Sequence, residues 1–270
     1  MSVHSSITRL TLTEIARLYR EGEKIVMLTC YDASFAAVMD AAGVELLLVG
    51  DSLGNVVQGE DSTLPVTLQQ MAYHTAAVKR GSQRAMIVSD LPFGASQLGP
   101  EDTFRNAARL MAAGAQMVKL EGGREMAATV EFLTRRGIPV CGHLGLTPQS
   151  VHQLGGFRVQ GKDAASAERL VDDARSLGEA GASMIVLEAV PASLADRITG
   201  EISVPTIGIG AGAGTSGQVL VVYDMLDIGI GRKPRFVKNF MASAGSVQAA
   251  VAAYVREVKA GAFPAGEHTY

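Results

Sequence analysis

The chain has 270 residues, of which 47% are hydrophobic, so it can bury a sizeable core. Its formal net charge of −3 offers no basic surface for a nucleic acid or an anionic membrane. No apolar run approaches the roughly 18 residues of a membrane-spanning helix, and the opening MSVHSSITRL has no apolar signal core, so we expect a cytoplasmic protein without membrane contacts.

The predicted elements alternate between helices and strands along the chain. A first helix is expected after Thr11, because Thr11 and Glu14 form a capping-box pattern before an apolar face. Apolar runs then predict strands over residues 24–32, 44–54, 85–90, 116–121, 138–144, 183–188 and 205–210. The second run, VELLLVGDSLG, is apolar without alternation at its centre, which is typical of a strand buried on both faces of a parallel sheet.

Helices are expected between these strands, because AAG, AAG, RRG and EAG precede four of them and a glycine commonly ends a helix. The predicted helices cover residues 33–42, 67–79, 101–114, 126–133, 163–180 and 247–259, with a shorter one after residue 188. The glycine-bearing loop LTPQSVHQLGGFRVQGKD is expected to lack regular structure, and loops of that length are usually functional, lids included.

The eighth strand has two possible locations. Residues 218–222 are our first choice, although they follow the seventh strand too closely for a normal crossover helix, and residues 236–240 are the alternative. The alternation continues without a Pro/Ser-rich linker, so we expect residues 1–270 to form one domain. The predicted fold class is α/β, a single (β/α)8 TIM barrel with an N-terminal helix before the first strand.

Carboxylates end three consecutive predicted strands. Asp51, Asp90 and Glu121 stand where neighbouring strands of a barrel converge at one rim. Three such charges repel one another unless a cation lies among them, and oxygen ligands suit Mg²⁺. Each acid could instead cap the helix that follows it. For three equivalent positions we favour the metal, and the sequence disfavours zinc because no Cys/His spacing of ligand type appears.

Lys119 is a candidate for binding an anionic substrate. It lies two residues before Glu121, so both side chains point to the same side of the strand. A plain ion pair between Lys119 and Asp90 is the alternative.

Glu188 ends the sixth strand, across the mouth from the second and third strands, and suits a general base working opposite a metal. Its alternative role is to cap the helix that follows. His143 could orient a carboxylate, bind substrate, or be a hydrogen-bonded structural residue. Tyr31 and Asp32, at the first strand, are weaker candidates.

The segment GIGAGAG, at residues 208–214, formally matches a dinucleotide-binding fingerprint, with Asp224 as the later acid. Residues 214–218 are too few for the helix that must receive a pyrophosphate. We therefore expect these glycines to form a tight turn or to let the backbone approach a ligand.

In sequence, the chain resembles the ketopantoate hydroxymethyltransferase (3-methyl-2-oxobutanoate hydroxymethyltransferase) family. The matching motifs run in order from about residue 24 to the C-terminal residues: LTCYDASFA, LLVGDSLGNVVQG, STLPVT, SDLPFG, VKLEGG, GHLGLTPQS, GGFRVQGK, VLEAVP, IGIGAG and GAFPAGEHTY. One departure is Asn55, where the family's motif is expected to have methionine.

The resemblance implies a barrel of the phosphoenolpyruvate mutase/isocitrate lyase type. It also implies transfer of a hydroxymethyl group from 5,10-methylenetetrahydrofolate to 3-methyl-2-oxobutanoate, giving 2-dehydropantoate for pantothenate and coenzyme A biosynthesis. A homo-oligomer, a homodecamer of two five-fold rings, is implied as well.

The resemblance also implies roles for individual residues. Glu188 would be the proton acceptor of the reaction. The Mg²⁺ ligands would be Asp51, Asp90 and Glu121, and the contacts to the keto acid would come from Asp51, Ser52, Asp90 and Lys119.

Two other functions remain open at this point. One is another Mg²⁺-dependent lyase or transferase that makes or breaks a carbon–carbon bond of a 2-keto acid. The other is a non-catalytic phosphate- or nucleotide-binding module built on GIGAGAG. The tail AAYVREVKAGAFPAGEHTY keeps Phe263, Pro264 and Tyr270 beyond the last helix, so it packs on a neighbouring subunit or back over the base of its own barrel.

Overall fold

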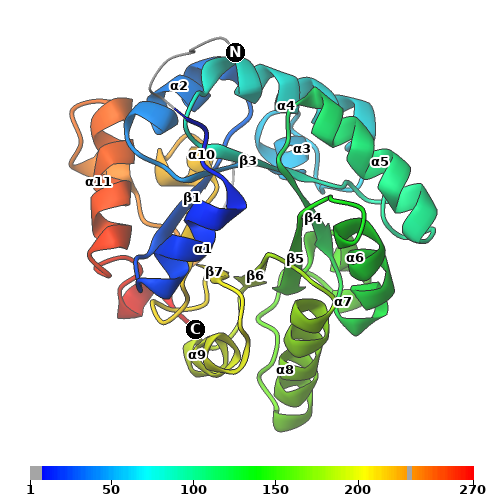
Figure 1. Cartoon of the computed structure of the whole chain (residues 1–270). Helices are drawn as coiled ribbons and strands as arrows, with labels where there is room; N and C mark the ends of the chain where they lie inside the picture. Colours follow the sequence, from blue (N-terminus) through cyan, green and yellow to red (C-terminus); the bar gives the residue numbers. More distant parts are fainter. Residues whose placement is uncertain (1–7, 230–232) are drawn as a thin grey trace.

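The computed structural model describes residues 8–229 and 233–270, and eight parallel strands in them form a closed barrel (Figure 1). Each strand pairs with the next in sequence, and the last pairs with the first. The strands are β1 (Ile25–Thr29), β2 (Leu46–Val49), β3 (Met86–Asp90), β4 (Met117–Glu121), β5 (Val140–Gly145), β6 (Met184–Glu188), β7 (Thr206–Ile209) and β8 (Gly217–Leu220). The predicted (β/α)8 barrel is confirmed.

Helices surround the strands, as Figure 1 shows. The longer ones are α1 (Leu12–Arg20), α2 (Ala33–Ala41), α4 (Leu68–Gly81), α5 (Pro100–Ala113), α6 (Ala127–Thr134), α8 (Ala164–Glu179), α9 (Ala192–Glu201) and α11 (Val247–Lys259). The short ones are α3 (Leu53–Val56), α7 (Val151–Leu154), α10 (Val222–Met225) and the 3₁₀ turns η1 (Arg124–Met126), η2 (Pro148–Ser150), η3 (Phe240–Ala242) and η4 (Gly266–His268).

Helix α1 lies at the end of the barrel where the strands begin. The predicted capping box is present, since the Thr11 amide donates to Glu14 Oε2 at 2.8 Å. The segment is held there by residues that precede strands: the Leu10 amide donates to the Arg84 carbonyl, and the Tyr19 hydroxyl to the Ile202 carbonyl. The opposite end, where the strands finish, is left open for a site.

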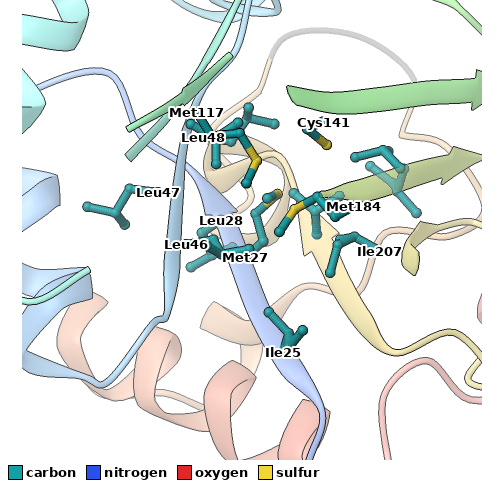
Figure 2. Packing of buried hydrophobic residues seen from close by; sticks show 14 of the residues in the cluster. Ile25, Met27, Leu28, Leu46, Leu47, Leu48, Met117, Cys141, Met184 and Ile207 are labelled. Atoms are coloured by element: carbon teal, nitrogen blue, oxygen red, sulfur yellow. The ribbon is translucent and has the colours of Figure 1, made fainter. Parts of the chain in front are cut away.

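Apolar side chains fill the barrel interior. Figure 2 shows Met27, Met117, Met184 and Ile207 gathered between the strands, whereas Leu47 points away from this cluster. These side chains are fully buried, and each such burial stabilises the fold by about 1.5–3 kcal/mol. Because side chains alternate along a strand, residues two positions further on also point inward, toward the carboxyl end of the barrel.

The eighth strand is β8, which confirms the first choice, residues 218–222, to within two residues. Residues 236–240 form no strand, and Phe240 instead begins η3. The chain from Gly210 to Ser216 runs back between β7 and β8 without a helix, so the GIGAGAG segment is a connection and not a dinucleotide fingerprint.

Several predicted elements differ in extent from the observed ones; the strand predicted over residues 24–32, for example, is Ile25–Thr29. The strand predicted over residues 44–54 is only Leu46–Val49, because the chain turns at Gly50 and begins α3 at Leu53. The loop after β5 contains η2 and α7, which the sequence analysis missed. Helices of one turn are too short to produce a readable periodicity.

The C-terminal tail packs against its own barrel. Phe263 is 3% exposed and lies against the rings of Phe240 and Tyr254, with centroids 5.5 and 5.8 Å away. The tail then continues to Tyr270, which lines the mouth of the barrel and not its base. An intramolecular partner therefore accounts for the apolar tail, and it no longer argues for a neighbouring subunit.

Within the described residues, no helix has the length and apolar character needed to cross a membrane. Residues 1–7, part of the segment in which the sequence analysis found no signal core, lie outside the described residues.

Candidate active site

Polar and charged side chains from five neighbouring strands meet at the carboxyl end of the barrel. Three of these side chains each lie two residues beyond an inward-facing apolar residue of their own strand. They are Asp90 at the end of β3, Lys119 on β4 and His143 on β5. Glu121 and Glu188 complete the group from β4 and β6, and Asp51 follows β2. All six line one cavity of about 750 Å³. The sequence analysis therefore predicted residues that the structure brings together.

Lys119 forms an ion pair inside this group. Its Nζ lies 2.8 Å from Asp90 Oδ1, and both side chains are buried. Burial alone lowers the pKa of Lys119, but the charge of Asp90, followed by those of Glu121 and Asp51, raises it above its ordinary value. Lys119 therefore stays cationic in the cavity. The alternative of an ion pair between Lys119 and Asp90 is therefore confirmed. Lys119 still lines the cavity.

Asp51 is the most strongly perturbed acid of the site. Burial, reinforced by the charges of Asp90 and Glu121, raises the pKa of Asp51 to about 8. Its backbone amide donates to Asp90 Oδ2 at 3.1 Å, so the two carboxylates are held next to each other. A cation at this point would relieve the repulsion.

Gln149 connects the carboxylates, and the sequence analysis missed it. Its side-chain Nε2 donates to Asp51 Oδ2 at 2.8 Å and to the Leu91 carbonyl at 2.9 Å. Its backbone amide donates to Glu121 Oε2 at 2.9 Å. Gln149 comes from η2 in the long loop after β5, and its place in the motif GHLGLTPQS was the one signal that could have indicated a role.

His143 bridges two acids that come from different strands. Its Nδ1 lies 3.4 Å from Glu121 Oε1, and its Nε2 lies 3.2 Å from Glu188 Oε2. Burial and the charge of Lys119 lower the pKa of His143, but hydrogen bonds to Glu121 and Glu188 outweigh them and raise it to about 9. When protonated, His143 is therefore placed to pair with Glu188, as the carboxylate-orienting alternative requires; its Nδ1 also lies 3.4 Å from Lys119 Nζ.

The backbone around Glu188 is tightly constrained. The Glu188 carbonyl accepts from the Leu146 amide at 2.8 Å, and Ala189 has a left-handed conformation with φ of 47°. The Ala189 carbonyl in turn accepts from the Gln160 amide at 2.9 Å, in the long loop. A left-handed alanine costs about 1–2 kcal/mol, and such strain is typical of positions where a side chain must be aimed.

Gly145 allows this close approach, which gives a testable expectation. A Cβ at Gly145 would lie 2.2 Å from the Glu188 carbonyl oxygen, and its φ is 89°. We expect Gly145→Ala to lower the free energy of unfolding by about 3 kcal/mol or more, since backbone strain and overpacking add. Gly137→Ala is the matched control: Gly137 has φ of 83° but open space around it, so only about 1–2 kcal/mol should be lost. Denaturant unfolding measures both, and equal losses would contradict the close approach.

The helix-capping alternatives do not apply to the rim acids. The N-cap residues of the helices that follow are Ser52 for α3, Gly99 for α5 and Pro191 for α9. Asp32, by contrast, does cap: it accepts from the Phe35 amide at the start of α2 at 2.9 Å. Ser52, predicted to contact substrate, lines the cavity, where its Oγ lies 2.9 Å from the Tyr31 hydroxyl.

The donor set fits a divalent cation with few protein ligands. With every group ionised, the four carboxylates exceed the cations Lys119 and His143 by two negative charges. One Mg²⁺ would neutralise them, and its charge would keep Asp51 ionised against the effects that raise its pKa. In residues 8–229 and 233–270, no three His, Cys, Asp or Glu side chains approach closely enough to ligate one ion. Mg²⁺ commonly takes only one or two carboxylates and keeps water or substrate oxygens, so the adjacent Asp51 and Asp90 suit it.

Solved structures of other proteins share this fold. The barrel is similar to phosphoenolpyruvate phosphomutase from Streptomyces platensis subsp. rosaceus, with TM-score 0.60 and 12% identity over 79% of this chain and 82% of that one. It is also similar to 2,3-dimethylmalate lyase, a PEP mutase/isocitrate lyase superfamily member, with TM-score 0.56 and 19% identity over 77% and 80% of the two chains. The fold is a (β/α)8 barrel of the phosphoenolpyruvate mutase/isocitrate lyase type.

The chain belongs to the ketopantoate hydroxymethyltransferase family, whose model matches residues 9–266. Its relatives include 3-methyl-2-oxobutanoate hydroxymethyltransferases from Nitrosospira multiformis, 62% identical over 97% of this chain and 100% of the relative. Another such relative, from Dechloromonas aromatica, is 60% identical over 100% of this chain and 99% of its own. The resemblance found in the motifs is confirmed.

Proposed function

We propose that the protein transfers a hydroxymethyl group from 5,10-methylenetetrahydrofolate to 3-methyl-2-oxobutanoate, giving 2-dehydropantoate for pantothenate biosynthesis. The observation that carries the proposal is the arrangement of Glu188. It shares one cavity with the adjacent carboxylates Asp51 and Asp90, and His143 holds it from the side. This arrangement suits removal of a proton next to a carbonyl group.

The chain's own side chains bind and orient the keto acid. Lys119, held cationic by Asp90, lies where it can neutralise the substrate carboxylate, and Ser52 can donate a hydrogen bond to it. Mg²⁺ held by Asp51 and Asp90, with Glu121 in its surroundings, would act as a Lewis acid on the keto and carboxylate oxygens and so favour loss of the C3 proton.

Glu188 accepts that C3 proton as general base, and His143 keeps its carboxylate aimed into the cavity. One of the two C–N bonds of the folate's methylene carbon breaks, and the substrate C3 forms a bond to that carbon. The second C–N bond breaks as water supplies the hydroxyl group of the product. The proton taken from C3 and one proton of water go to the two folate nitrogens, so that tetrahydrofolate leaves.

Product analysis tests the proposal. Purified protein with Mg²⁺, 3-methyl-2-oxobutanoate and ¹³C-labelled methylenetetrahydrofolate is expected to form labelled 2-dehydropantoate, detected by mass spectrometry. Pyruvate and 2-oxobutanoate serve as comparison acids. Absence of the labelled product with activity on another 2-keto acid would favour a different Mg²⁺-dependent carbon–carbon bond enzyme of this fold.

We further propose that the protein is a cytoplasmic homo-oligomer, a homodecamer, because the family resemblance implies it. Because residues 263–270 belong to the chain's own fold, truncation of the tail is no test of assembly. Light scattering on the full chain over a range of concentrations is expected to give a mass of about ten times the 28.3 kDa chain. A monomer would contradict this prediction.

A further inference from the structure

The cavity extends well beyond the cluster of rim acids. Its volume of about 750 Å³ lies in the range that holds drug-sized ligands, about 300–1,000 Å³, whereas the keto acid has only five carbons. The part of the lining to which no role has been assigned above includes aromatic, acidic and basic side chains: Phe157, Arg158, Asp224, Arg235, Phe236 and Tyr270.

Phe236 and Tyr270 form an aromatic wall of this cavity. Their rings pack edge to face with centroids 6.5 Å apart. They lie against Gly210, where a Cβ would come within 2.6 Å of Phe236 Cδ1 and 3.1 Å of Tyr270 Cε2. The Tyr270 carbonyl accepts from the Ala192 amide at 3.0 Å, which fixes its backbone. The glycine-rich connection between β7 and β8 thus makes room for the wall.

The aromatic wall lies next to the proposed base. Burial raises the pKa of Tyr270, Arg235 opposes this effect, and the charge of Glu188 raises the pKa further. Tyr270 and Glu188 line the same cavity, so a ring bound against the wall would share that cavity with the proposed base.

Asp224 supplies a second acidic position in the cavity, apart from the rim acids. It lies on α10, directly after β8, and is half-buried. The charges of Asp224 and Asp90 both act on the buried phenol of Tyr31 and raise its pKa, although burial is the larger cause. Asp224 thus lies near Tyr31, which follows the first strand, and it lines the same cavity as Asp51 and Asp90.

Two exposed arginines lie at the entrance of the cavity. Arg158 follows the exposed Phe157 in the long loop, and Arg235 lies with its guanidinium carbon 5.9 Å from the Tyr270 ring centroid. Arg235 Nε donates to the Glu267 carbonyl at 3.1 Å, which leaves its other guanidinium nitrogens for a ligand. The outer cavity therefore offers an aromatic wall, the carboxylates of Asp224 and Asp61, and two arginines at its entrance that can bind an anion.

These features match the chemistry of a reduced pterin with an anionic tail. The pyrimidine edge of a pterin presents an N–H and an amino group side by side, and one carboxylate can accept from both. We propose that Asp224, the Phe236–Tyr270 wall, Arg158 and Arg235 form the subsite for the one-carbon donor. Asp224 binds the pterin edge, the wall contacts its ring, and the arginines bind the glutamate carboxylates. This assignment rests on the folate donor proposed above.

Binding measured without turnover tests the subsite. Calorimetric titration with tetrahydrofolate, which carries no one-carbon unit, is made in the presence of 3-methyl-2-oxobutanoate. Asp224→Asn is expected to raise the Kd by about 10-fold or more, because a charge-assisted pair of hydrogen bonds is weakened. Asp172→Asn, which removes an exposed carboxylate on α8 that does not line the cavity, should leave the Kd unchanged.

A pterin without the glutamate tail tests Asp224 and the two arginines separately. Asp224→Asn should weaken the binding of both 6-methyltetrahydropterin and tetrahydrofolate. Arg158→Ala and Arg235→Ala should weaken the binding of tetrahydrofolate alone. C3 proton exchange of the keto acid without folate should stay normal in all of these variants, which also shows that they fold.

Three results would overturn the assignment. They are an unchanged Kd for tetrahydrofolate in Asp224→Asn, loss of keto-acid exchange in that variant, and failure of 6-methyltetrahydropterin to bind the wild-type protein. If tetrahydrofolate itself fails to bind the wild-type protein, the proposed donor is wrong, and the subsite is rejected with it.

Discussion

The Glu188→Gln variant is expected to bind 3-methyl-2-oxobutanoate with a nearly unchanged Kd and to exchange its C3 proton about 10²-fold more slowly or worse. Glutamine keeps the size of the side chain and removes the group that accepts the proton. His143 Nε2, 3.2 Å from Glu188 Oε2, can still donate to the amide oxygen, so the side chain should stay in place. Deuterium exchange at C3, followed by NMR without folate, measures the step directly.

Glu131→Gln is the matched control for this variant, because Glu131 is an exposed glutamate on α6 and does not line the cavity. It should exchange at the wild-type rate. If Glu188→Gln also exchanged at that rate, the base would be another group. His143 is the next candidate, because it lines the same cavity.

The largest effect on metal dependence is expected from Asp51→Asn and Asp90→Asn. Each substitution removes one charge from the adjacent pair and keeps the volume of the side chain. Mg²⁺-dependent formation of product should fall about 10²-fold or more, because the ion supplies several kcal/mol of stabilisation to the reacting oxygens. Calorimetric titration with Mg²⁺ should show a weakened Kd in both variants, while circular dichroism shows the fold retained.

Asp61→Asn tests whether any acid of the cavity would give the same result. Asp61 lines the same cavity but is exposed, in the loop before α4. Its substitution should leave Mg²⁺ affinity within about a factor of two, because an exposed charge is well screened. Normal Mg²⁺ affinity in Asp51→Asn or Asp90→Asn would show that the ion is held elsewhere.

The barrel could be predicted from the sequence because its signals are local. Each strand is an apolar run buried on both faces, and the helices between several of them close with glycine. The acids were found for the same reason: Asp90, Glu121 and Glu188 are the last residues of their strands. The pairing of neighbouring strands then placed them at one rim without further information.

The contacts within the site could not be predicted, because they depend on the approach of distant segments. Gln149 joins Asp51 and Glu121 from a loop whose one-turn helices leave no periodic pattern. His143 was ambiguous because its two partners come from different strands. The tail was also ambiguous, since an apolar segment indicates only that a partner exists, and Phe240 and Tyr254 supply it from within the chain.

Closure of the barrel by β8 and β1 has a consequence for how the chain acquires its activity. The ring is completed only when Ile25 pairs with Gly217, a contact between segments far apart in sequence. All six rim residues lie between these positions, so they have already been synthesised before the ring can close. Non-local pairing of this kind is slow to form. An incomplete nascent chain therefore carries all six rim residues without the barrel that brings them together, and exchange of the C3 proton should not appear before the last strand has paired.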